Sequence, residues 1–132
     1  MQTRWRDNDV YGHVNNVVYY EYFDTAVNAW LHEQVGRVAR EGEAIGVVAE
    51  TTCRYLHAVS FPQRIVVGLA CERLGKTSIT YRLAIFAADA ERTGPAALGW
   101  FVHVYVDRDT RRPVAVPAPI REVVQRVLVP GY

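Results

Sequence analysis

The 132-residue sequence predicts an α+β protein in which one long, mostly apolar helix packs against an antiparallel sheet. Three observations predict this class. A helical segment that is apolar on nearly every face begins near residue 17, a series of strand-like stretches separated by turns follows, and a short amphipathic helix comes last. The sequence has no internal repeat and no low-complexity segment, so we expect one domain spanning residues 1–132.

A short strand is predicted over residues 1–6, followed by a loop and a helix over residues 17–31. In the strand, apolar and basic side chains alternate. In the helix only four polar residues interrupt the apolar run, and three of them share one stripe of a 3.6-residue turn. These three are Glu21, Asp24 and Asn28. A helix this apolar must be buried with one thin polar edge exposed, and Gly36 marks its end.

The remaining sequence predicts four antiparallel strands and a closing helix. Both faces of the last strand are largely apolar, which in an antiparallel sheet means that both are covered. The long helix can cover one face and another subunit the other. The closing helix follows Pro117 and Pro119 and has an apolar stripe made by Ile120, Val123, Val124, Val127 and Leu128. The predicted strands span residues 45–59, 64–74, 77–88 and 96–107, with a polar loop at 89–95.

Composition excludes several classes of function. The formal net charge is +1, with 15 basic and 14 acidic residues, so the chain has no strong basic field with which to bind nucleic acid. No apolar run approaches the length of a membrane span and no signal pattern opens the sequence, so we expect a cytoplasmic protein. Cys53 and Cys71 lie in apolar runs without CxxC spacing, and we expect buried free thiols.

Motifs for serine or metal-dependent chemistry are missing. The sequence lacks GxSxG, and neither Ser60 nor Ser78 has the surroundings of a nucleophile. Its four histidines form no HExxH pattern and no close ligand cluster, so we expect no metal and no cofactor. His57 and His103 lie in predicted strands and read as ordinary core or rim histidines. Lys76 and Ser78 form a hairpin corner that can hold a phosphate or be a plain turn.

The loop before the long helix is the candidate site. Asp9 and His13 lie within five residues of each other, and Gly12 permits a tight backbone approach. Asn15 or Asn16 is a suitable N-cap, and the free N–H groups of the first helical turn can stabilise a developing negative charge. The alternative is that the acid and the asparagines only cap the helix. An acid, a histidine, a glycine and two asparagines are more than a cap needs.

The segment DNDVYGHVNNVVYYEYFDTAVNAWL (residues 7–31) resembles the signature of acyl-CoA thioesterases of the 4-hydroxybenzoyl-CoA thioesterase type. It is most similar to bacterial long-chain acyl-CoA thioesterases whose loop reads DVYxHVNN, and it also resembles the D-x-N-x-H-V-N-N segment of plant acyl-carrier-protein thioesterases. The resemblance implies the hotdog fold, a five-stranded antiparallel sheet wrapped around the long helix. It also implies a homodimer with its active sites at the subunit interface, often as a dimer of dimers.

The resemblance implies roles for individual residues. Asp9 matches the catalytic carboxylate, acting as general base on water or as nucleophile on the thioester carbonyl. The backbone N–H near Asn16 matches the oxyanion donor, and His13 matches the histidine that orients water or the carboxylate. The plant enzymes have Asn where this chain has Tyr11, so their Asp/Asn/His scheme does not transfer whole. Some hotdog thioesterases place the carboxylate on the helix, which makes Glu21 the second candidate for the base.

We therefore predict hydrolysis of an acyl-CoA to a free carboxylic acid and CoA, with acyl carrier protein as the alternative carrier. Asn15, Tyr19, Lys76 and Ser78 are predicted to bind substrate, with Tyr19 nearest to the acyl group. One alternative is a hydratase or dehydratase of acyl thioesters on the same fold, although its D-x-N-P-x-H spacing is absent. Another is a non-catalytic acyl-thioester binding module, because a buried helix and a sheet explain most of the sequence without catalysis.

Overall fold

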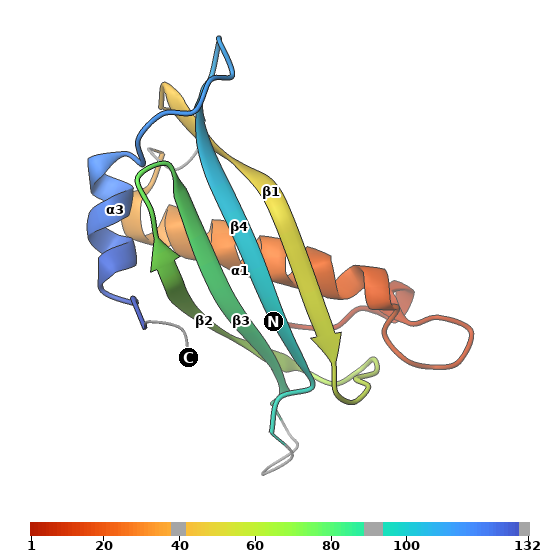
Figure 1. Cartoon of the computed structure of the whole chain (residues 1–132). Coiled ribbons are helices and arrows are strands. Elements are labelled where there is room, and N and C mark those ends of the chain that lie inside the picture. Colours follow the sequence, from red (N-terminus) through yellow and green to blue (C-terminus); the bar gives the residue numbers. More distant parts are fainter. Residues whose placement is uncertain (38–41, 89–93, 130–132) are drawn as a thin grey trace.

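A computed structural model of the chain describes residues 1–37, 42–88 and 94–129 (Figure 1). Four antiparallel strands form one sheet in the order β1-β4-β3-β2, and the long helix crosses one face of it. The α+β class is therefore confirmed. The elements are η1 (Trp5–Asp7), α1 (Asn16–Val35), β1 (Ala44–Tyr55), β2 (Ile65–Leu74), β3 (Ser78–Ala87), β4 (Ala97–Asp107) and α3 (Ala118–Gln125).

The sheet has four strands, and the prediction of five was wrong because no strand forms over residues 1–6. In this segment Gln2 makes one isolated bridge beside the start of β2, and the chain then turns into η1. The turn forms because the Asp7 carboxylate accepts the backbone N–H of Arg4 at 2.8 Å. A side chain that captures the backbone locally competes with pairing to a neighbouring strand.

Helix α1 begins one residue before the predicted range of 17–31 and extends four residues beyond it, to the predicted end at Gly36. Asn15 is the N-cap, with its side-chain oxygen accepting the Val17 N–H at 2.9 Å. Gly36 ends the helix with a φ of 63°, a value that glycine adopts without steric cost. The exposed side of α1 is wider than the predicted thin polar edge, because the sheet covers only one side of the helix. Its exposed residues are Asn16, Val17, Glu21, Asp24, Thr25, Asn28, Ala29, His32, Glu33 and Gln34.

The core lies between α1 and the inner face of the sheet. Alternating residues of β3 and β4 point into it, as the period of two requires. Phe23 of α1 packs edge-on against Phe101 of β4, with ring centroids 6.3 Å apart. The largest inward side chains of the two strands are Ile79, Tyr81, Leu83, Ile85, Phe101, His103 and Tyr105.

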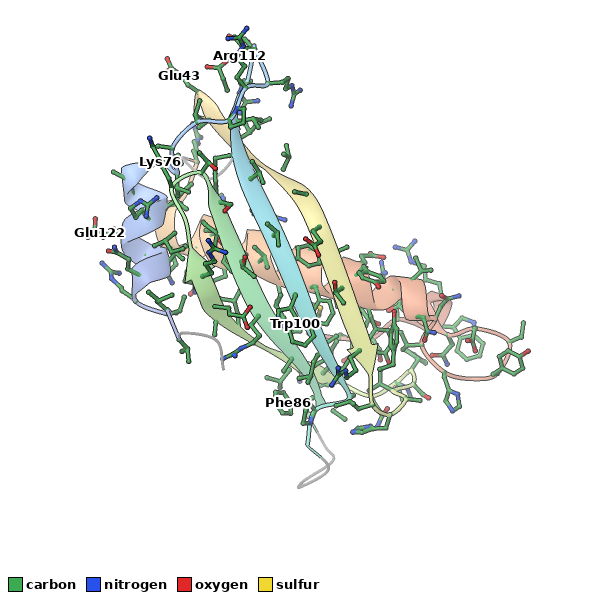
Figure 2. The ribbon with its side chains drawn as sticks, in the orientation of Figure 1. Glu43, Lys76, Phe86, Trp100, Arg112 and Glu122 are labelled. Atoms are coloured by element: carbon green, nitrogen blue, oxygen red, sulfur yellow. The ribbon has the colours of Figure 1, made fainter. Side chains whose placement is uncertain are left out.

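The two edges of the sheet differ. The β2 edge is covered, because residues 127–129 after α3 pair with Cys71 through two backbone hydrogen bonds of 2.8 and 2.7 Å. The β1 edge has no partner strand in the described parts of the chain. α3 buries Ile120, Val123 and Val124 of its predicted stripe. The helix ends at Gln125, so Val127 and Leu128 of that stripe lie beyond it, and Leu128 is exposed. The open face of the sheet carries Trp100 and Phe86 (Figure 2).

Some predictions concern residues outside the described ranges. The predicted loop at 89–95 falls mostly there, as does part of the connection after α1. Cys71 is a buried free thiol, as predicted, and Cys53 is a half-buried one. None of the described helices is long and apolar enough to cross a membrane.

Candidate functional site

A pocket of about 330 Å³ opens where the loop before α1 meets the end of β1. Three stretches of the chain line it: residues 9–14, the first turn of α1, and the residues from the last position of β1 onward. The lining residues are Asp9, Tyr11, His13, Val14, Asn16, Tyr19, Tyr55, Leu56, His57 and Ala58. Four of the predicted site residues therefore share one pocket: Asp9, His13, Asn16 and Tyr19.

The loop that carries Asp9 is a short hairpin held by its own hydrogen bonds. The Asp9 N–H donates to the His13 carbonyl at 2.8 Å, and Asn8 bridges to Val14. Gly12 takes a φ of 80°, which a residue with a side chain rarely adopts. The hairpin thereby places the acid and the histidine at one rim of the pocket.

One oxygen of the Asp9 carboxylate holds this loop and the other is free. Oδ1 accepts the backbone N–H of Tyr11 at 2.8 Å and, more weakly, that of His13 at 3.5 Å. Oδ2 has no hydrogen-bond partner among residues 1–37, 42–88 and 94–129. The side chain is half-buried, so the free oxygen can still reach a water molecule.

A second carboxylate, Asp7, fixes the loop to the helix. Its side chain is 1% exposed, pairs with the Arg4 guanidinium at 2.8 Å and accepts the Tyr22 hydroxyl at 2.7 Å. Burial alone would raise the pKa of Asp7, but the hydrogen bonds from Arg4 and Tyr22 outweigh it and hold that pKa below its usual value. Asp7 was not predicted as a site residue, because the DVYxHVNN motif begins at Asp9 and leaves Asp7 outside it.

The first turn of α1 presents one unused N–H group to the pocket. The Val17 and Val18 N–H groups both donate to Asn15, at 2.9 Å each, and the Asn15 N–H donates to the Asp7 carbonyl at 2.8 Å. The Asn16 N–H has no acceptor in the part of the chain that is described. Because it lies at the positive end of the helix dipole, this group can bind a negatively charged oxygen.

The end of β1 lines the pocket from the other side. Tyr55 and His57 were not predicted as site residues, because the sequence does not reveal that the end of β1 meets the start of α1. The only available signal was that Tyr55 alternates onto the same face of its strand as Cys53. The Tyr55 ring packs edge-on against Tyr19, with centroids 5.1 Å apart, and burial raises the pKa of both tyrosines.

The other predicted residues lie elsewhere. Asn15 uses its side chain as the helix cap, and Glu21 pairs with Arg4 at 2.9 Å and does not line the pocket. Lys76 and Ser78 lie at the β2–β3 turn, at the far end of the sheet (Figure 2). Ser78 pairs with Val104 of β4, and Tyr55 pairs with Ala97 of the same strand. These two positions of β4 are seven residues apart, so about 23 Å along the strand separates Ser78 from the pocket residue Tyr55.

This arrangement suits attack on a carbonyl carbon. A carboxylate with a free oxygen can activate water or attack directly, and an unused N–H can stabilise the oxyanion that results. Within the described ranges, no group of three or more His, Cys, Asp or Glu side chains gathers as a metal site.

Comparison with known proteins identifies the family. Residues 3–127 match the family described as the thioesterase-like superfamily. The PA5185 protein from Pseudomonas aeruginosa PAO1 is 46% identical with a TM-score of 0.92, and the match covers 100% of this chain and 91% of that one. No curated protein matches the chain significantly.

Two further solved structures similar to this chain are thioesterases. A thioesterase from Thermus thermophilus, complexed with coenzyme A and Zn, is 28% identical with a TM-score of 0.79, covering 96% and 90% of the two chains. A 1,4-dihydroxy-2-naphthoyl-CoA thioesterase from Synechocystis, at 16% identity and a TM-score of 0.83 over 95% and 92%, shares the fold. The chain therefore belongs to the thioesterase-like superfamily, has the hotdog fold and is a thioester hydrolase.

Proposed function

We propose that the protein hydrolyses an acyl-CoA thioester to a carboxylic acid and CoA in the pocket at the start of α1. The family supports the reaction class, and the CoA-bound relative from Thermus thermophilus supports CoA as the carrier. We further propose that the chain is a single domain that works as a homodimer or homotetramer. A cytoplasmic location stays a prediction.

The observation that carries the proposal is the unused Asn16 N–H beside a carboxylate with one free oxygen. The thioester carbonyl oxygen accepts the Asn16 N–H, and the carbonyl carbon then faces Asp9. In the general-base route, Asp9 takes a proton from water as the water oxygen bonds to that carbon. The C–S bond of the oxyanion intermediate then breaks, and CoA leaves as a thiolate that takes up a proton.

In the nucleophilic route, an oxygen of Asp9 bonds to the carbonyl carbon, the C–S bond breaks and CoA leaves as a thiolate that takes up a proton. Water then hydrolyses the resulting mixed anhydride. Single turnover in ¹⁸O-labelled solvent detects the nucleophilic route when water attacks the Asp9 carbon of the anhydride. Label in Asp9 then shows that route, because the general-base route places ¹⁸O only in the product acid. His13 orients the water or the carboxylate in either route.

The first test measures thiol release from aromatic, short-chain and long-chain acyl-CoAs and from acyl carrier protein. We expect Asp9→Asn to lower kcat roughly 100-fold without changing the fold, because the amide cannot act as base or nucleophile. His13→Ala should lower it less, and Glu21→Gln should not change it. Addition of EDTA should leave the rate unchanged. A wild-type rate in Asp9→Asn would remove this residue from the mechanism.

The second test removes the oxyanion donor alone. Asn16 is the first residue of α1, a position that tolerates proline, and Asn15 has the extended ψ of 137° that a residue before proline prefers. Asn16→Pro therefore deletes the N–H and keeps the helix. We expect kcat to fall roughly 100-fold. Asn16→Ala keeps the N–H and serves as the matched control with a near wild-type rate.

The same assays address the two alternatives. A fall in enoyl-CoA absorbance without thiol release would support a hydratase. Binding of acyl-CoA without any turnover would support a binding module. Either result would contradict the proposed hydrolysis.

A further inference from the structure

We propose that Tyr55 is a positioning residue, whose hydroxyl holds the first turn of α1 so that the Asn16 N–H faces the reacting carbonyl. The inference rests on the proposed function and names a residue that neither the sequence motif nor the family match singles out. Tyr55 lies 39 residues from Asn16 in the sequence.

The contact is made at the residue that carries the free donor. The Tyr55 hydroxyl donates to the Asn16 carbonyl oxygen at 3.0 Å. Among the described residues, Asn16 is the one at the start of α1 whose own N–H has no acceptor. A hydrogen bond to the carbonyl of this residue restrains the backbone that carries that N–H.

Tyr55 is itself held rigidly. It is the last residue of β1 and pairs with Ala97, and the next two N–H groups, of Leu56 and His57, both donate to the Ala96 carbonyl at 2.8 and 3.1 Å. Its ring packs edge-on against Tyr19. The Tyr55 hydroxyl therefore fixes the first turn of α1 relative to the sheet.

Two backbone hydrogen bonds also hold the residues just before α1. The Val14 N–H donates to the Val59 carbonyl, and the Asn15 N–H donates to the Asp7 carbonyl, at 2.8 Å each. These bonds lie before the helix, whereas the bond from Tyr55 acts inside its first turn. Burial raises the pKa of Tyr55, so the hydroxyl stays a donor throughout the neutral range.

Tyr55→Phe removes the hydroxyl and keeps the ring on Tyr19. We expect kcat to fall roughly three- to tenfold, the effect of one neutral hydrogen bond, with KM changed less than twofold. Tyr81→Phe is the matched control, because the Tyr81 hydroxyl is buried in the core and has no hydrogen-bond partner among the described residues. It should leave both constants unchanged, and both variants should melt cooperatively.

A double-mutant cycle separates positioning from a general loss of packing. In an Asn16→Pro background there is no N–H left to position, so Tyr55→Phe should cause no further loss of kcat. An equal further loss would show that the hydroxyl acts elsewhere and would overturn the inference. The ¹⁵N amide resonances of Asn16 and Val17 give a readout that does not depend on the rate. Tyr55→Phe should shift both resonances, and two unchanged resonances would also overturn the inference.

The cycle distinguishes this inference from the proposed function. A wild-type rate in Asn16→Pro would contradict the oxyanion site itself and the role of Tyr55 with it. If Asn16→Pro lowers kcat but Tyr55→Phe keeps the wild-type kcat, only the role of Tyr55 is contradicted.

Discussion

Two carboxylates only two positions apart have different surroundings. Asp7 is buried and fully engaged with Arg4 and Tyr22, whereas Asp9 is half-buried and keeps one oxygen free. An ion whose charge is already balanced is a poor base or nucleophile. Asp7 therefore serves the structure of the loop, and Asp9 remains available for chemistry.

Asp7→Asn tests this division at the residue scale. The amide loses the charge-assisted bonds to Arg4, so we expect the free energy of unfolding to fall by about 2 kcal/mol in urea denaturation at pH 7. Asp9→Asn is the control and should leave it nearly unchanged. Because the folded pKa of Asp7 is lowered, its contribution is complete above the ordinary carboxyl pKa and is lost as the pH falls below it. Equal stability of the two variants would contradict the assignment.

His103 provides a second test at this scale. It is 3% exposed, neither ring nitrogen has a hydrogen-bond partner in the described parts of the chain, and burial lowers its pKa against a smaller opposing effect of Asp24. The unfolded chain therefore binds the proton more readily than the folded one. Stability should be full above about pH 6.5 and should fall as the pH drops below it.

Urea denaturation at pH 5.5, 6.5 and 7.5 measures this dependence. The apolar variant His103→Leu removes the unpartnered nitrogens and should flatten the curve over this range. Tyr81 and Tyr105, the neighbouring inward side chains, stay uncharged there because burial raises their pKa values, that of Tyr105 to about 12. If wild type and variant followed the same pH curve, another group would be responsible.

At the scale of elements, the packing of α1 on the sheet depends on a missing side chain. Gly99 of β4 lies under the Phe23 ring, and a Cβ built on it would approach that ring to 2.5 Å. Phe23 is completely buried, so its ring has no free space to move into. The position of the helix over the sheet is therefore set at this contact, and with it the pocket at the helix start.

Gly99→Ala should destabilise the protein by roughly 1–3 kcal/mol, because the helix or the ring must shift to accept the methyl group. Gly68→Ala is the matched control in the same sheet. Its Cβ would meet Phe86 at 3.7 Å, an ordinary contact, so we expect little change. Thermal unfolding of both variants measures the difference, and a tolerated Gly99→Ala would contradict the tight packing.

At the scale of the whole molecule, residues 1–37, 42–88 and 94–129 leave two surfaces of the sheet uncovered. One is the unpaired edge of β1, and the other is the open face of the sheet that carries Trp100 and Phe86 (Figure 2). An exposed, partly apolar edge strand is a template for pairing with another chain. The family resemblance implies a homodimer with its active sites at the subunit interface, and the pocket lies at the end of β1, so we expect a second copy to cover the β1 edge.

Two exposed valines allow this to be tested. Val48 in β1 is 46% exposed, and Val66 in β2, at the opposite edge, is 53% exposed. Val48→Asp should convert dimers to monomers in analytical ultracentrifugation, because the charge would be buried against the partner copy. Val66→Asp should leave the dimer intact and can affect only a tetramer. A dimer that survives Val48→Asp would place the interface elsewhere.

Local sequence signals were sufficient for most of the elements. The apolar run of α1 and its glycine at 36 are determined by nearest neighbours along the chain, and the structure confirms them. The sequence left the N-cap open between Asn15 and Asn16, and the structure shows that it is Asn15. The four later strands follow from alternation in the same way. The prediction of a first strand was wrong because the Asp7 carboxylate accepts the backbone N–H of Arg4 and turns the chain. The periodicity of the sequence does not reveal this hydrogen bond.

The residues of the candidate site also fall into those that local sequence predicted and those that only the tertiary structure revealed. The sequence by itself determined the loop with Asp9, His13 and Asn16, because these residues are contiguous and their chemistry is readable from their types. Only the tertiary structure brought Tyr55 and His57 to the same pocket and separated Lys76 from it. Contacts between residues 39 positions apart depend on how the helix lies across the sheet, and that is decided by packing in three dimensions.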